Sequence, residues 1–260
     1  MRNIKNFSII VMLSAFAIAL IQCSKENIEV KNTEALELRN TGSLLDFLGT
    51  SCVPGIINVG VGCNDEEYID TLVINDLPNY PGCTFKIIYK RYECEALGLK
   101  DVTIGDFQIL EHNCQQYSND LNNAYNGRIL SNFVINFELS VWNKIRDHII
   151  TKYVVGNAYP CGSSALFQIN FIRSSCYRIA NYNQGNGLGV STKITCGSQC
   201  CERHTFVCTN PDGSLFIVEE DETGGPINCS DPPFLSDPPN TLGRWRLTWV
   251  SDCMVLCPGN

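Results

Sequence analysis

Residues 85–94 read FKIIYKRYEC, and residues 167–176 read FQINFIRSSC. In each stretch large apolar side chains recur at every second position, which is typical of a β-strand with one buried face. Both stretches fit the pattern Phe-x-Ile-x-aromatic-x-Arg-x-x-Cys, and the two copies lie 82 residues apart. The next cysteine follows 20 residues later in each case. We interpret the stretches as strands of an internal duplication, although abundant cysteines and strand alternation also produce such agreement by chance.

The arginines of this pattern, Arg91 and Arg173, fall on the same strand face as the aromatic side chains. An arginine that points into the core needs a carboxylate or a carbonyl group as its partner. An arginine at the end of a strand instead extends its charged group to water while its methylene groups stay buried. The sequence leaves both arrangements open.

Shorter alternations of the same kind predict further strands along the chain. They cover residues 102–110, 205–208, 215–218 and 245–249. Between the second and third of these, residues 210–213 read NPDG, a turn sequence that suits a hairpin. Gly, Pro and Asn bound the segments, as expected for strands that are joined by turns.

One segment has the spacing of a helix rather than of a strand. Apolar residues recur at intervals of four at Phe133, Phe137, Val141, Ile145 and Ile149. This spacing predicts an amphipathic helix near residues 131–149, packed on a sheet, with Ser131 or Asn132 as its N-cap. We therefore expect a mainly β or α+β fold, with disulfide-rich antiparallel sheets and at least one amphipathic helix.

Composition limits the class of protein. The chain has 260 residues, of which 44% are hydrophobic, so it has room for one large domain or two modest ones with a buried core. The net charge of −8 and the pI near 4.9 argue against a nucleic-acid partner, which would favour clustered Lys and Arg.

Cysteine usage points to an oxidising compartment, where disulfides persist. Five cysteines lie between Cys52 and Cys114, and nine lie between Cys161 and Cys257. Because both counts are odd, complete pairing needs at least one bridge between the two halves, although the pairing itself does not follow from sequence. The 14 disulfide candidates are Cys52, Cys63, Cys83, Cys94, Cys114, Cys161, Cys176, Cys196, Cys200, Cys201, Cys208, Cys229, Cys253 and Cys257.

The N-terminus has the features of an export signal. Arg2 and Lys5 precede an apolar run from Phe7 to Ile21. A run of 15 residues is short for a transmembrane helix, which needs about 20, and it has the proportions of a secretory signal. Cys23 follows almost directly. The segment resembles the signal of bacterial lipoproteins, in which a cysteine after the apolar core is lipidated and becomes the mature N-terminus.

The lipoprotein resemblance implies a signal peptide over residues 1–22 and lipidation at Cys23. It implies transport to the outer membrane because Ser24, not Asp, follows the cysteine, and Lys25–Glu26 is similar to a surface-export signal. We therefore expect a chain anchored to the outer membrane through acyl chains and facing the exterior. Ordinary cleavage after Ala19 is the alternative. It leaves 15 cysteines with one unpaired, whereas acylation leaves 14 that can all pair.

The remaining chain divides into three parts. Residues 23–43 are charged, contain few large apolar residues and are interpreted as a tether. Residues 44–156 form a first cysteine-containing half, which includes the predicted helix, and ordered structure should begin near Leu44. Residues 157–260 form a second, cysteine-rich half that we expect to be covalently linked to the first by at least one disulfide.

Two clusters have the residue types of metal ligands. Residues 196–208 read CGSQCCERHTFVC and offer the thiolates and imidazole that zinc binds. In an exported chain we expect these cysteines to be oxidised, with Cys200 and Cys201 bridged to different partners. Residues 219–222 read EEDE and offer the oxygen ligands that calcium prefers, but we interpret them as a solvated turn. We therefore expect neither a metal site nor a cofactor.

The motifs of known hydrolases, zinc proteases and nucleotide-binding loops do not occur in the sequence. We therefore expect a surface ectodomain that acts as a binding or envelope-assembly module, with a glycan or an envelope protein as its partner, rather than an enzyme. The alternative is an extracellular hydrolase that uses a pair of carboxyl groups on glycans or peptides. Trp245 and Trp249 have the chemistry to stack on sugar rings, although same-face strand tryptophans are more often core residues.

Overall fold

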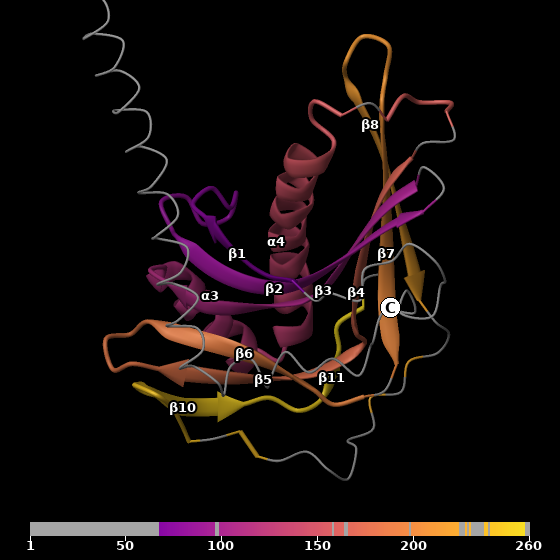
Figure 1. Ribbon diagram of the computed structural model, residues 1–260. Helices are drawn as coiled ribbons and strands as arrows, with labels where there is room; N and C mark the ends of the chain where they lie inside the picture. The colour runs from indigo at the N-terminus through magenta and orange to yellow at the C-terminus, as the bar shows by residue number, and fades with distance from the viewer. Residues whose placement is uncertain are drawn as a thin grey trace, which may run out of the picture. The chain divides into compact units, whose positions relative to one another are not determined.

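The computed structural model describes residues 68–96, 99–157, 159–163, 166–197, 199–223, 227, 229, 237–238 and 240–257. The predicted signal peptide, the tether and the start of order near Leu44 lie outside these residues. The described part contains two β-sheets and two α-helices (Figure 1). The predicted mainly β fold with an amphipathic helix is therefore confirmed.

The first sheet has six strands in the order β1-β2-β3-β4-β7-β8. Neighbouring strands are antiparallel except for β3 and β4, which are parallel, so this sheet is mixed rather than purely antiparallel. The strands are β1 (Tyr68–Ile74), β2 (Phe85–Ala96), β3 (Leu99–His112), β4 (Phe167–Ser174), β7 (Cys200–Thr209) and β8 (Leu215–Thr223).

The second sheet is built around β5, which pairs with β6 along one edge and with β10 and β11 along the other. Strand β9 pairs with β10. The strands are β5 (Cys176–Asn183), β6 (Gly189–Thr195), β9 (Thr241–Leu242), β10 (Trp245–Val250) and β11 (Met254–Val255). All pairs in this sheet are antiparallel, which agrees with the antiparallel sheets that the sequence predicted.

Two helices connect the parallel strands β3 and β4, because parallel neighbours need a long crossover connection. They are α3 (Gln115–Asn126) and α4 (Leu130–Tyr153). Helix α4 extends along the six-stranded sheet (Figure 1). Trp142 of this helix stacks on Phe171 of β4 at 4.4 Å between ring centroids. Helix α3 contacts the second sheet, where Tyr125 stacks on Trp249 at 4.1 Å.

The helix predictions need two corrections. Helix α4 contains the predicted apolar stripe but begins at Leu130 after Ile129, which has no side-chain cap, so the predicted cap at Ser131 or Asn132 is wrong. The helix starts earlier because the chain enters it from a tight turn after α3, in which the Ile129 N–H donates to the Ala124 carbonyl (3.0 Å). Helix α3 itself was not predicted, because its sequence QQYSNDLNNAYN is mostly polar.

Both arginines of the repeated pattern point inward, which settles the two arrangements that the sequence left open. Arg91 is 4% exposed and pairs with the carboxylates of Asp70 (2.6 Å) and Glu93. Arg173 is 3% exposed and donates to Glu138 and to the carbonyl oxygen of Leu256.

The two strands of the repeated pattern, β2 and β4, lie in the same sheet and contribute to the same core as α4. The bridges around them do not correspond. Cys114 pairs with Cys83, whereas Cys196, the cysteine at the matching position, pairs with Cys253. The internal duplication therefore stays a prediction.

Candidate functional site

A groove of about 600 Å³ lies between the turn at Leu77–Tyr80 and the two helices. We call it the α3–α4 groove. Its volume is within the range of small-molecule pockets, about 300–1,000 Å³. Twelve described residues line it, and half of them are polar.

The apolar half of the lining is supported by two ring–ring contacts of Phe137. Tyr80 packs edge-on against Phe137 with 6.0 Å between ring centroids, and Phe137 also contacts Tyr117 with 4.6 Å between centroids. Tyr80 and Phe137 are buried, whereas Ile129 is 57% exposed at the start of α4. The apolar lining residues are Leu77, Tyr80, Ala124, Ile129, Phe133 and Phe137.

The polar half of the lining consists mainly of amide side chains. Four amides, one carboxylate and one hydroxyl face the groove, and most of these residues are exposed to solvent. They are Asn79, Gln116, Asp120, Asn123, Asn136 and Ser140. Amides both donate and accept hydrogen bonds, so the groove offers both functions to a ligand.

A disulfide joins two walls of the groove. The Tyr80 N–H donates to the Leu77 carbonyl (3.0 Å), which forms the turn of the first wall. Cys83 follows this turn and is bonded to Cys114, the N-cap residue of α3. The Cys83–Cys114 bridge thus fixes the turn against the helix that forms the second wall.

The link between α3 and α4 contains an unusual backbone conformation. Arg128 has φ of +60°, a left-handed conformation in which glycine is usual. This turn reverses the chain within three residues and presents Ile129 to solvent at the edge of the groove. Ile129 therefore adds an exposed apolar side chain to the edge of the groove.

Tyr80 and Asp120 are electrostatically coupled across the groove. Burial raises the pKa of the Tyr80 hydroxyl above its usual value, and the negative charge of Asp120 raises it further. The phenol therefore stays protonated at neutral pH, and its O–H donates a hydrogen bond to the Asp120 carboxylate. The carboxylate retains acceptor capacity for a ligand, because an ionised carboxylate accepts about four hydrogen bonds.

Behind the groove lies a set of buried charges. Phe133 and Phe137 line both the groove and a second cavity of about 20 Å³, which Glu138 and Lys193 also line. We call Asp106, Glu138, Arg173 and Lys193 the buried charge cluster. They come from β3, α4, β4 and β6, so the cluster connects both sheets to the long helix.

Every charge in this cluster has an opposite partner. Lys193 donates to Asp106 and lies 2.8 Å from a Glu138 oxygen, while the other Glu138 oxygen accepts from Arg173. Burial lowers the pKa of Lys193 to about 8, which the Asp106 charge opposes, so the side chain remains an ammonium at neutral pH. The two positive and two negative charges sum to zero, and the ion pairs join α4 to strands of both sheets.

The disulfide prediction is borne out for the cysteines that the structure describes. The described bridges are Cys83–Cys114, Cys161–Cys208, Cys176–Cys229, Cys196–Cys253 and Cys201–Cys257. Cys200 is disulfide-bonded as well, and not to Cys201, as predicted. The remaining candidates, Cys52, Cys63 and the side chain of Cys94, lie outside the described residues, as does the predicted lipidation site Cys23.

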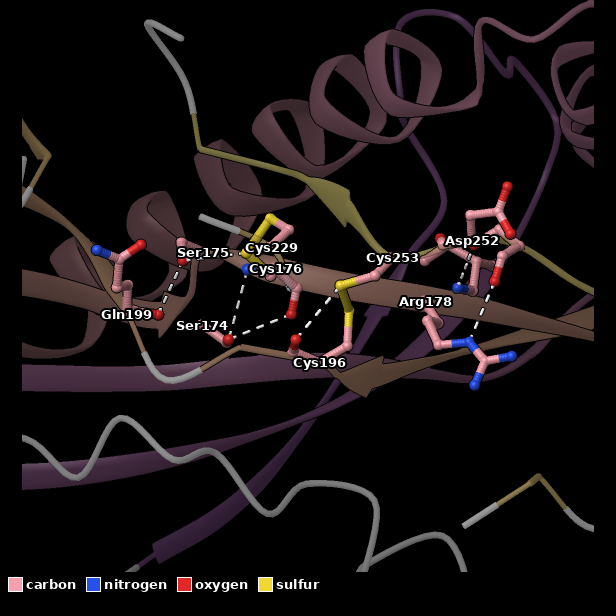
Figure 2. Close-up of a disulfide and its surroundings, with 11 residues drawn as sticks. Ser174, Ser175, Cys176, Arg178, Cys196, Gln199, Cys229, Asp252 and Cys253 are labelled. Carbon is pink, nitrogen blue, oxygen red and sulfur yellow. Dashed lines mark hydrogen bonds between the residues drawn. A yellow bond between two sulfur atoms is a disulfide. The ribbon is translucent and has the colours of Figure 1, made fainter. Parts of the chain in front are cut away.

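The possible zinc ligands of residues 196–208 are all oxidised cysteines apart from His204. Sulfur atoms of Cys176, Cys229 and Cys253 do lie within 4.8 Å of one another. Figure 2 shows the cause, which is that the Cys176–Cys229 and Cys196–Cys253 bridges lie side by side. Zinc binds thiolates rather than disulfide sulfurs, so this group offers no ligands in the oxidised protein.

The possible metal ligands His204 and residues 219–222 take part in contacts within the six-stranded sheet. The Nδ1 atom of His204 lies 2.6 Å from Asn170 Oδ1 on the neighbouring strand. Residues 219–222 continue strand β8, so the prediction of a solvated turn is wrong. Arg203 pairs with Asp221 at 2.6 Å and offsets part of the carboxylate repulsion that would disfavour a strand.

Trp249 is partly buried and packs against the core, and its ring and its N–H are both used in contacts within the protein. Its ring stacks on Tyr125, and its Nε1–H donates to Asn122 Oδ1 (2.7 Å) on α3. The groove was not predicted, because the signals for it are local and weak. The density of Asn and Gln over residues 115–126 is the one sequence feature that marks its polar wall.

Comparison of the chain with protein-family models, with curated proteins and with solved structures found no match. Neither described helix combines the length and the apolar character that crossing a bilayer requires.

Proposed function

We propose that this protein is a lipid-anchored, disulfide-stabilised module of the cell surface that binds a ligand in the α3–α4 groove. The observation that carries the proposal is the groove itself. It combines a volume of about 600 Å³ with buried aromatic rings and six polar side chains. Such a mixture of apolar surface and few oriented polar groups is typical of ligand sites.

The construction of the groove supports binding because its walls are held before a ligand arrives. The Cys83–Cys114 bridge fixes the turn to α3, and Phe137 is anchored in the core by its contacts with Phe85 (5.4 Å) and Tyr117. A preformed site loses less conformational entropy when it binds, which increases affinity.

The groove favours binding over hydrolysis. Among the described residues that line it, Asp120 is the single carboxylate, whereas glycoside hydrolysis uses two carboxyl groups about 5–10 Å apart. The described pair Asp106 and Glu138 is buried and neutralised by Lys193 and Arg173. Neither arrangement supplies a proton donor and a nucleophile to a bound substrate.

The lipid anchor rests on the sequence. The apolar run before Cys23 and the charged tether after it would hold the domain at a membrane surface. The density of disulfides agrees with an extracytoplasmic location, because such bridges persist in oxidising compartments.

The proposal is tested by filling the groove. Asn123 and Asn126 are both exposed asparagines of α3, but only Asn123 lines the groove. We expect Asn123→Trp to abolish binding of ligands selected from a glycan array and a displayed peptide library, whereas Asn126→Trp retains it. Equal binding by both variants, or no binding by the unmodified chain, would refute the proposal.

A second test separates the groove from general stability. The Cys83–Cys114 and Cys161–Cys208 bridges close loops with sequence separations of 31 and 47 residues. The chain-entropy model gives each about 4 kcal/mol of stabilisation. Removing either bridge by paired Cys→Ala changes should lower the melting temperature similarly, but only loss of Cys83–Cys114 should weaken ligand binding.

A further inference from the structure

The charge and hydrogen-bonding pattern of the α3–α4 groove indicates what kind of ligand it takes. We infer that the ligand is an uncharged oligosaccharide. This inference rests on the proposed function and deepens it by naming the chemical class.

The first observation is the hydrogen-bonding inventory. Asn79, Asn123 and Asn136 lie on three different walls, and each amide offers two donors and an acceptor. A sugar hydroxyl both donates and accepts, so a hydroxyl-rich ligand satisfies such a wall from many orientations. Asp120 adds a strong acceptor for one or two of these hydroxyls.

The second observation is the apolar surface between the amides. Tyr80, Phe133 and Phe137 line the groove, and Phe133 is the most exposed of the three rings because the other two side chains are 6% exposed. A pyranose ring has C–H groups on its faces and hydroxyls around its edge. Its faces pack on aromatic rings, which carry negative charge density above and below their planes, while its edge meets the polar side chains.

The third observation is the absence of cations. No Lys, Arg or His occurs among the described residues that line the groove, and Asp120 gives it a negative charge. Phosphorylated, sulfated, sialylated or uronate-containing ligands would therefore be repelled and left without a charged partner. This argues for a ligand without negative charge.

A peptide ligand fits the groove less well. Two common modes of peptide binding are the addition of a strand to a sheet edge and the insertion of a helix into a mainly hydrophobic groove. The α3–α4 groove is lined by a turn and two helices and by no residue of a described strand, and half of its lining residues are polar.

The test uses the full chain on an array that carries neutral, acidic and amino-sugar oligosaccharides of similar length. We expect neutral oligosaccharides to bind at least tenfold more tightly than their uronate counterparts. Asp120→Lys should reverse this preference. Asp147→Lys is the matched control, because Asp147 is exposed on α4 outside the groove, and it should leave the preference unchanged. Unchanged melting curves confirm that both variants fold.

The outcomes distinguish the inference from the proposed function. If acidic oligosaccharides bind as tightly as neutral ones and Asn123→Trp still removes binding, the inference is wrong and the groove remains a binding site. The same holds if no oligosaccharide binds but displayed peptides bind in a manner that Asn123→Trp removes. If neither oligosaccharides nor peptides bind, or if Asn123→Trp leaves binding unchanged, both the oligosaccharide inference and the proposed binding function are wrong.

Discussion

Replacing Glu138 by glutamine tests whether the buried charge cluster holds α4 against both sheets. The Glu138 side chain is 3% exposed, and its partners Arg173 and Lys193 are 3% and 7% exposed. The cluster contains two cations and two carboxylates, so the substitution leaves one buried positive charge without compensation. Removing one partner of a buried ion pair costs about 3–5 kcal/mol. Since a domain is stable by only about 5–15 kcal/mol, Glu138→Gln should remove about a fifth or more of the total free energy of unfolding.

The assay is urea unfolding at neutral pH without reductant, followed by circular dichroism, so that the disulfides stay intact. Asp221→Asn is the matched control, because Asp221 forms a similar pair with Arg203 but its side chain is 41% exposed. An exposed pair contributes about 0–1 kcal/mol. Equal costs for the two variants would refute the view that burial makes the Glu138 contacts important.

Three further predictions follow from the same structure. Burial lowers the pKa of His112 to about 4, so the unfolded chain binds more protons than the folded chain between pH 6.5 and 4. As the pH decreases through this window, the free energy of unfolding should decrease by up to about 3 kcal/mol more than in His112→Gln. Urea unfolding at each pH measures the difference. Reductant should unfold the chain, because each of the five described bridges contributes about 2–4 kcal/mol, and an unchanged melting temperature would argue against this. Mass spectrometry should find Cys23 acylated. It should also find Cys200 linked to a cysteine before residue 157, since the other eight cysteines after that residue pair among themselves.

The strands were predictable because their signal is local. Alternation with a period of two reports that one face of a strand is buried, and the rows of Phe85, Ile87 and Tyr89 in β2 do face the core. The acidic end of β8 escaped prediction because Glu and Asp disfavour strands in isolation. Pairing with β7 and the contact of Glu219 with Arg146 of α4 override that local preference.

The site was not predictable, because tertiary contacts create it. Helix α3 has few apolar residues, and its position depends on the cap and bridge at Cys114 and on the stacking of Tyr125 on Trp249. The period of two placed Arg173 on the same strand face as the aromatic side chains, and the structure shows that its charged group points inward. The period of two did not identify Glu138 as its partner, since the two residues are 35 positions apart and belong to different elements.

The groove and the charge cluster are mechanically linked through α4. Phe137 lines the groove, and the next residue, Glu138, binds Arg173 and Lys193. A shift of α4 that widened the groove would therefore separate Glu138 from both cations, and the cost of leaving buried charges unpaired opposes that shift. Four of the five described bridges lie after residue 157, in the half of the chain that supplies these cations. The disulfide-rich half thus stabilises a groove to which it contributes no described lining residue, because it holds the helix that forms one of the walls.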